Sequence, residues 1–218
     1  MTVPVEEPDQ EQDGTQQAVE EPEDEVLAVA ARVLAQAGAY SVLHPGCGAG
    51  RYSRYLAAAG FSVTAFDLMA VAVRMAATRD VAADLAIRYL VDDPSLPMRD
   101  MGKFDGVFAP NILHLFEFRE RQRVLRLLSK HLRPGGVAIV TVLSVHDERY
   151  GHGRETEPDT FEVLPGQLMH FYSEDELHYE LQGHFHVALI ESATEAETDH
   201  LGTRREYAVL LACGVKRD

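Results

Sequence analysis

The amino-acid sequence predicts an α/β fold: a doubly wound, seven-stranded and mostly parallel sheet with helices on both faces and a C-terminal antiparallel strand pair. Three observations predict it. Strand patterns alternate with helix patterns over residues 23–143, which implies crossover connections and parallel strands. A glycine-rich loop, residues 46–50, follows the first strand. The last two strand patterns, 184–190 and 206–213, have no helix between them, as is typical of antiparallel pairs.

The charge distribution predicts two parts of the chain. Of 35 acidic residues, ten lie in residues 1–25, which contain no Lys or Arg. We therefore expect a disordered acidic tail over residues 1–22 and a single domain over 23–218. Residues 26–218 contain the other 25 acidic residues and all 20 Lys and Arg residues. This negative balance argues against a nucleic-acid partner.

Composition also predicts the compartment. No apolar run approaches the roughly 20 residues of a membrane span, so we expect no membrane partner. The N-terminus is acidic, whereas a signal peptide begins with basic residues. Cys47 and Cys213 are too few for a disulfide framework. A cytoplasmic protein with reduced thiols is the expectation, and the oligomeric state is left open.

The first elements surround the glycine loop. Residues 23–37 have apolar positions at helical spacing, and Gly38 ends this helix. The apolar run 40–44 is a short strand that leads into the loop. A helix over 52–59 follows, closed by glycine.

The alternation of strands and helices continues to residue 143. Further strands are predicted over 61–66, 87–91, 104–109 and 137–143. Further helices are predicted over 69–78 and 118–132. The second of these stops at Arg133-Pro134-Gly135-Gly136, because proline cannot continue a helix.

The last third of the chain has a different pattern. Residues 144–172 are polar and rich in glycine and proline, so we expect an irregular lid over the mouth of a pocket. Aromatic residues within it could line that pocket or pack onto the sheet. Ser173 and Glu176 form a capping box for a helix over 174–182.

The loop Gly46-Cys47-Gly48-Ala49-Gly50 is the strongest candidate site. It lies between a strand and a helix, where open α/β sheets bind ligands. Its spacing is G-x-G-x-G, whereas the dinucleotide fingerprint needs a glycine at position 51, which is Arg51. This disfavours a nicotinamide-dependent oxidoreductase. A tight turn without a ligand is the simpler alternative.

Two carboxylates follow neighbouring strands at the same sheet edge. Asp67 ends the second strand, where a carboxylate can accept hydrogen bonds from both ribose hydroxyls. It could also cap the helix beginning near Met69. Asp92 ends the third strand and could accept from an adenine amino group, or simply be a turn residue before Pro94.

Five motifs in order resemble the class I S-adenosylmethionine-dependent methyltransferases. They are VLHPGCGAG, VTAFDLM, YLVDDPSLP, FDGVFAPNILHLF and LRPGGVAIVTV. The chain is most similar to the small-molecule branch, including compact tellurite- and thiopurine-methylating enzymes, and HFYSEDEL resembles a helix start in these. The resemblance implies a Rossmann-like fold, S-adenosylmethionine as cofactor, and methyl transfer to O, N, S or C of a small molecule.

The resemblance also implies site residues. The glycines would surround the methionine part of the cofactor, Asp67 would bind its ribose, and Leu68 and Met69 would lie beside its adenine. The full set of expected cofactor-binding residues is His44, Gly46, Cys47, Gly48, Gly50, Asp67, Leu68, Met69, Asp92, Asp93, Ala109 and Asn111. His44 departs from the family, which usually has an acid there. A protein that binds the cofactor without transferring methyl groups is therefore the alternative.

Candidate catalytic bases are His114, after the fourth strand, and His146, which could pair with Asp147 after the fifth. Either histidine could instead be structural, His114 by packing under the sheet edge. His146, His152 and His170 share one segment, but their spacing matches no zinc pattern, so no metal site is expected.

Overall fold

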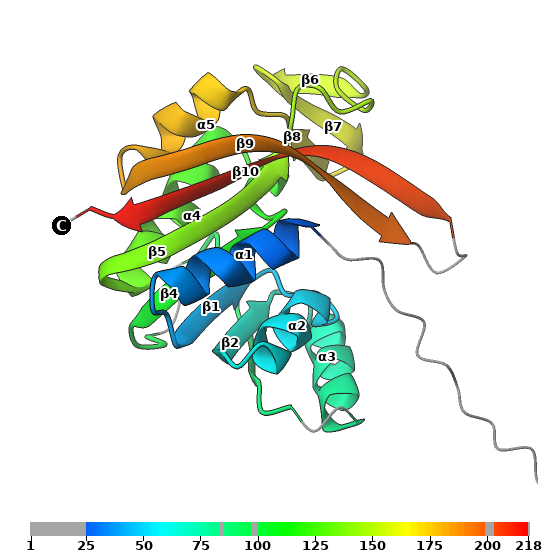
Figure 1. Cartoon of the computed structure of the whole chain (residues 1–218). Helices are drawn as coiled ribbons and strands as arrows, with labels where there is room; N and C mark the ends of the chain where they lie inside the picture. Colours follow the sequence, from blue (N-terminus) through cyan, green and yellow to red (C-terminus); the bar gives the residue numbers. More distant parts are fainter. Residues whose placement is uncertain (1–24, 83–84, 97–99, 199–202, 218) are drawn as a thin grey trace, which may run out of the picture.

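A seven-stranded sheet is the frame of the computed structural model, which describes residues 25–82, 85–96, 100–198 and 203–217 (Figure 1). The predicted tail over residues 1–22 lies outside these ranges. The strands of this sheet are β1 (Ser41–Pro45), β2 (Ser62–Asp67), β3 (Arg88–Val91), β4 (Phe104–Pro110), β5 (Leu132–Leu143), β9 (Phe185–Thr198) and β10 (Arg204–Lys216). The helices are α1 (Glu25–Gln36), α2 (Arg51–Ala58), α3 (Ala70–Ala82), α4 (Phe118–His131), α5 (Glu174–Leu181) and the 3-10 turn η1 (Leu113–Leu115).

The strand order is β3-β2-β1-β4-β5-β10-β9. The first five strands are parallel, and β10 is antiparallel to both of its neighbours. The predicted doubly wound sheet with a terminal antiparallel pair is confirmed. None of the described helices is long and apolar enough to cross a membrane.

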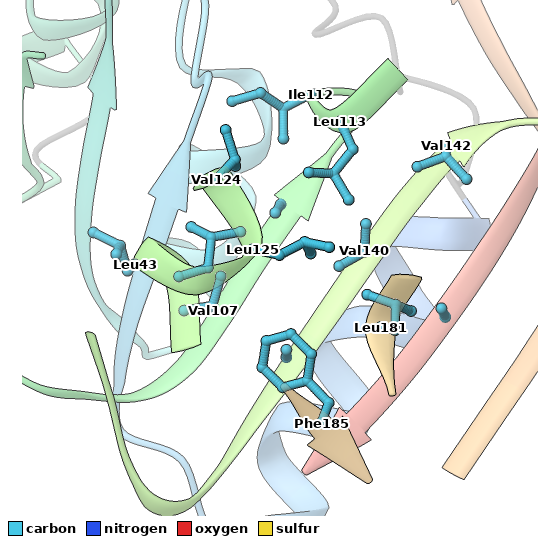
Figure 2. Packing of buried hydrophobic residues seen from close by; sticks show 14 of the residues in the cluster. Leu43, Val107, Ile112, Leu113, Val124, Leu125, Val140, Val142, Leu181 and Phe185 are labelled. Carbon is cyan, nitrogen blue, oxygen red and sulfur yellow. The ribbon is translucent and has the colours of Figure 1, made fainter. Parts of the chain in front are cut away.

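Helices cover both faces of the sheet. On one face α4 and α5 contribute Leu125 and Leu181 to a cluster with strand residues such as Val107 and Val140, and Phe185 closes its lower end (Figure 2). On the other face α1 and α2 pack a second cluster that includes Leu34 and Leu56. Burial of both faces explains why the central strands are almost continuously apolar.

The β9–β10 hairpin is longer than the rest of the sheet. β10 pairs with β5 only from Val209 to Val215, whereas residues 204–208 pair with residues 194–198 of β9. We call these two segments the β-arm. The arm continues past the carboxyl end of β5 (Figure 1). It therefore reaches the edge of the sheet where parallel α/β proteins bind their ligands.

Several predicted elements differ from those of the structure, including β5, which begins at Leu132 and not at residue 137. The insert 144–172 contains a small antiparallel sheet of β6 (Arg154–Glu157), β7 (Thr160–Leu164) and β8 (Gln167–His170) instead of being irregular. These strands are too short and too polar to show a clear apolar alternation. β9 runs to Thr198 because the polar residues after Ile190 pair with β10. α3 extends to Ala82, four residues further than expected.

Candidate cofactor-binding site

The glycine loop connects β1 to α2 by a backbone path that needs glycine. Gly46, Gly48 and Gly50 have φ values of 66°, 51° and 82°, in the left-handed region. A Cβ at Gly50 would lie 2.5 Å from the Tyr89 hydroxyl. A Cβ at Gly46 would lie 2.9 Å from Cδ1 of Ile112. The loop is therefore packed against β3 and against the segment after β4.

Asp67 binds the loop from the end of β2. Its Oδ2 accepts the backbone N–H of Gly48 at 2.9 Å, and its Oδ1 accepts the N–H of Met69 at 2.8 Å. The predicted proximity of Asp67 to the glycine loop is confirmed, and so is its hydrogen bond to the chain entering α3. Leu68 and Met69 beside it are about 60% exposed, a large apolar surface next to a charged group.

A cavity of about 330 Å³ opens between the loop, the ends of β1 and β4, and the β-arm. Its position at the carboxyl ends of parallel strands is the place expected for a ligand. The lining residues are His44, Gly46, Cys47, Ala49, Arg51, Tyr52, Pro110, Asn111, Glu195, Ala196 and Tyr207.

Asn111 has an unusual backbone at the end of β4. Its φ of 52° is in the left-handed region, which few residues other than glycine adopt. Its N–H is bound by the carbonyl of Thr141 at 3.0 Å, which holds it in place. Its side-chain amide donates to the carboxylate of Glu195 on the β-arm. The loop after β4 and the β-arm are thus joined directly above the cavity.

His44 is a neutral residue under the cavity. It is 1% exposed, and its Nδ1 lies 2.8 Å from the hydroxyl oxygen of Ser53. Burial lowers the pKa of His44 to about 3, so the imidazole carries no charge near pH 7. Its Nε2 is buried and has no hydrogen-bond partner among the residues that the structure describes.

Comparison with known proteins identifies this arrangement. The profile of the methyltransferase domain family matches residues 43–140, which run from β1 into β5. This range contains the glycine loop, Asp67 and Asn111. This part of the chain, a little under half of its length, is therefore similar to a methyltransferase domain.

Curated relatives are similar to about half of the chain. A malonyl-[acyl-carrier protein] O-methyltransferase from Pseudescherichia vulneris is 35% identical over 104 residues, which are 48% of this chain and 39% of that protein. A ubiquinone biosynthesis O-methyltransferase from Caulobacter vibrioides is 31% identical over 105 residues, 48% of this chain and 41% of its own length. The chain thus spans about two fifths of the length of these relatives.

Solved structures share the fold over more of the chain. The 1,6-didemethyltoxoflavin-N1-methyltransferase of Burkholderia thailandensis aligns with a TM-score of 0.67 at 23% identity. The alignment covers 90% of this chain and 80% of that protein. This likeness shows that the shared fold continues beyond residues 43–140.

Within this methyltransferase fold, Cys47 is a protonated thiol. Burial and, to a lesser extent, the nearby Asp67 carboxylate raise its pKa to about 12. The helix that follows the loop does not lower this pKa below its ordinary value, because the effect of burial is larger. Cys47 lines the cavity as a small apolar group.

The other expected cofactor residues divide into two groups. Asn111 lines the cavity, whereas Ala109 is fully buried within β4 and Pro110 takes its place in the lining. Asp92 and Asp93 lie outside this cavity. The N–H of Asp92 donates to the carbonyl of Asp67 at 3.1 Å, which places it at the same sheet edge. Asp93 accepts the N–H and hydroxyl of Ser95 at 2.8 and 2.7 Å, as a turn residue does.

The two candidate bases do not line the cavity. His114 lies in η1, is 6% exposed, and has its pKa lowered to about 3 by burial. His146 is exposed after β5, and the described partners of the Asp147 carboxylate are Arg149 and Ala208 instead. The possible pairing of His146 with Asp147 is not formed, because Asp147 binds the base of the β-arm.

The segment 144–172 meets α4 and α5 at a largely buried ion-pair network. His170, Glu176 and Glu180 have ligand atoms within 4.8 Å of one another, close enough for a metal ion. However, Nη2 of Arg121 lies 3.0 Å from Glu180 and 3.8 Å from Glu176. This guanidinium pairs with both carboxylates, and its central carbon lies 5.6 Å from the centre of the Tyr172 ring. The cluster attaches the small sheet to α4 and α5.

The residues that the sequence analysis missed come mostly from the β-arm. Glu195, Ala196 and Tyr207 line the cavity although they are separated from the glycine loop by about 150 residues. The polar stretch after Ile190 has no apolar alternation and matches none of the family motifs. Arg51 and Tyr52 directly follow the glycine loop and could have been inferred from that position.

Proposed function

We propose that this chain binds S-adenosylmethionine across the glycine loop and transfers its methyl group to a small-molecule acceptor. The observation that carries the proposal is the joining of Asp67, the glycine loop and a cavity at one sheet edge. The chain covers only part of its curated relatives, so their activities support this proposal by analogy.

The residues present fit this cofactor. Gly48 has no atom within 4 Å of the position that a Cβ would occupy, so a ligand can approach its backbone closely. Each Asp67 oxygen accepts one backbone N–H and retains an acceptor position for a ribose hydroxyl. The exposed Leu68 and Met69 side chains offer an apolar surface for an adenine ring. The cavity on the other side of the loop is left for the amino-acid end.

The chemistry requires mostly positioning. The bound cofactor supplies a methyl group already activated by a sulfonium, so the protein has to align a nucleophile within roughly 3–3.5 Å. Asn111 and the β-arm line the cavity, where an acceptor would approach the methyl group. His114 and His146 remain predictions as bases for acceptors that must lose a proton.

The acceptor is proposed to be a small molecule in a cytoplasmic setting. Relatives are named as O- and N1-methyltransferases, so an acceptor screen has to include hydroxyl and ring-nitrogen compounds. The aromatic residues of the insert do not define the acceptor, since Phe161, Phe171 and Tyr172 are buried in the cores.

A second function is a protein that binds the cofactor without methyl transfer. The observation that favours it is His44, which is neutral and buried where the family usually has an acid. A weakly held amino-acid end would reduce alignment of the methyl group. Both functions predict cofactor binding, and they differ in turnover.

Thermal unfolding with ligands tests the proposal. S-adenosylmethionine or S-adenosylhomocysteine at about 100 times its dissociation constant adds roughly 2.7 kcal/mol of stability. For a domain of this size that raises the unfolding midpoint by about 5–11 °C. NADH is the control and should leave the midpoint unchanged. A shift with NADH alone would contradict the proposal.

A further inference from the structure

The charged residues that line the cavity are complementary to an amino acid. Among its described lining residues Glu195 is the single acid, and Arg51 is the single base that is charged at neutral pH. His44 adds no charge, because burial keeps it neutral. One carboxylate and one guanidinium are the complement of a zwitterion with an ammonium and a carboxylate.

In the proposed function, the cofactor's amino-acid end is the zwitterion that would reach this cavity. Asp67, which binds the ribose in the proposed function, lies at the end of β2. The cavity lies one and two strands away, at the ends of β1 and β4. Neighbouring strands are about 4.8 Å apart, so these positions are roughly 5–10 Å from the ribose. A four-carbon amino-acid chain attached through sulfur spans that distance.

We propose that Glu195 binds the α-ammonium group of the cofactor and supplies the carboxylate that position 44 lacks. This inference rests on the proposed function and assigns to the β-arm a ligand contact that lies outside the family motifs. Glu195 is 4% exposed and lines the cavity. A carboxylate has about four acceptor positions, so it can hold the Asn111 amide and an ammonium at the same time.

The β-arm holds Glu195 in a fixed position. Its cross-strand partner is Tyr207, and cross-strand pairs orient each other's side chains. The guanidinium of Arg149 lies 4.2 Å from the centre of the Tyr207 ring. Asp147 binds Arg149 through Nε at 2.6 Å and accepts the N–H of Ala208 at 2.9 Å. The base of the arm is therefore anchored to the end of β5, and the acid is presented to the cavity by a rigid element.

The substitution Glu195→Gln tests this role with little change of shape. A glutamine side chain still offers a carbonyl oxygen to Asn111, so it removes the charge and retains that hydrogen bond. The matched control is Glu191→Gln, which makes the same change at an exposed position of the same strand. Thermal unfolding without ligand checks that both variants fold.

Binding is measured by calorimetry with S-adenosylhomocysteine and with 5′-methylthioadenosine, which lacks the amino-acid end. Glu195→Gln should weaken S-adenosylhomocysteine binding roughly ten- to a hundredfold, the range for a lost hydrogen bond to a charged group. It should change methylthioadenosine binding less than about twofold, and Glu191→Gln should change neither. An equal loss for both ligands would overturn the proposal, since the arm would then act on the whole site.

Three further outcomes separate this inference from the proposed function. Unchanged S-adenosylhomocysteine affinity in Glu195→Gln, with binding intact in the wild-type chain, would overturn the role of Glu195 alone. Unchanged S-adenosylhomocysteine affinity together with reduced methyl transfer in Glu195→Gln would show that Glu195 contacts the acceptor. That result would also overturn the proposed contact with the α-ammonium group. If the wild-type chain bound neither ligand, the proposed function itself would fail.

Discussion

The carboxylate of Asp67 accepts the backbone N–H of Gly48 at 2.9 Å, so the end of β2 is bound to the middle of the glycine loop. This contact places a potential ribose acceptor directly beside the loop. It also means that one side chain both shapes the loop and faces the proposed ligand. Changes at Asp67 are therefore expected to affect both the shape of the loop and the binding of the ligand.

Asp67→Ala should weaken binding of S-adenosylhomocysteine by about 1.5–3 kcal/mol, because hydrogen bonds to a charged acceptor are lost. Calorimetric titration measures the change. Asp100→Ala is the control, since Asp100 is exposed and accepts a backbone N–H from Gly102 in the turn before β4. Unchanged affinity in Asp67→Ala would rule out the ribose site.

Substitutions in the glycine loop should lower the free energy of unfolding by different amounts. Gly48→Ala introduces only the strain of a positive φ, about 1–2 kcal/mol, because no atom lies near the new Cβ. Gly50→Ala adds overlap with Tyr89 and Ala76, so its total cost should be about 2–5 kcal/mol. Urea unfolding of the two variants gives the comparison. A larger loss of stability in Gly48→Ala than in Gly50→Ala would contradict the packing described for the loop.

Acid should destabilise the fold through its buried histidines. The pKa values of His44 and His114 are lowered by burial to about 3, so the unfolded chain binds protons below pH 6.5 that the folded chain does not. Stability therefore falls with falling pH between about 6.5 and 3. Each histidine should lower the free energy of unfolding by about 2 kcal/mol at pH 5 relative to pH 7.5.

Denaturant midpoints at pH 5 and 7.5 measure this effect, and the variants His44→Gln and His114→Gln should each reduce the difference. Asp147 does not contribute in this range. Burial opposes its ionisation, but hydrogen bonds from Arg149 and Ala208 outweigh that and lower its pKa. Its stabilisation is present above the unfolded value of about 4 and is lost only below it. An identical pH dependence in both histidine variants and the wild type would show that the imidazoles are hydrated.

Asp147→Asn should loosen the β-arm. It removes the charge that binds Arg149 and weakens the hydrogen bond to Ala208, at a cost of about 1–3 kcal/mol. Because Arg204 and Arg205 are exposed at the start of β10, trypsin should cleave there faster in the variant. The affinity of the Asp147→Asn variant for S-adenosylhomocysteine should also be lower than that of the wild-type chain. Unchanged proteolysis would show that the arm is held by its strand pairing alone.

The sequence predicted the parts of the fold that follow from local patterns. Apolar runs such as 137–143 and the glycine loop located the sheet and its ligand edge, and the position of Asp67 at the end of β2 is confirmed. The β9 side of the β-arm, residues 194–198, could not be predicted, because it is mostly polar and its pairing with β10 is set by long-range contacts. Glu195 reaches the cavity only through that pairing. The buried network around Arg121 likewise joins elements that are distant in sequence.

The most direct test asks whether the cofactor occupies the cavity under the β-arm. Ala196 lines this cavity from the arm, so Ala196→Trp should fill it without touching Asp67. Titration calorimetry with S-adenosylhomocysteine should show binding to the wild-type chain and at least a tenfold loss in Ala196→Trp, with both proteins folded. Equal binding to the two proteins would place the cofactor elsewhere and would contradict the proposed site.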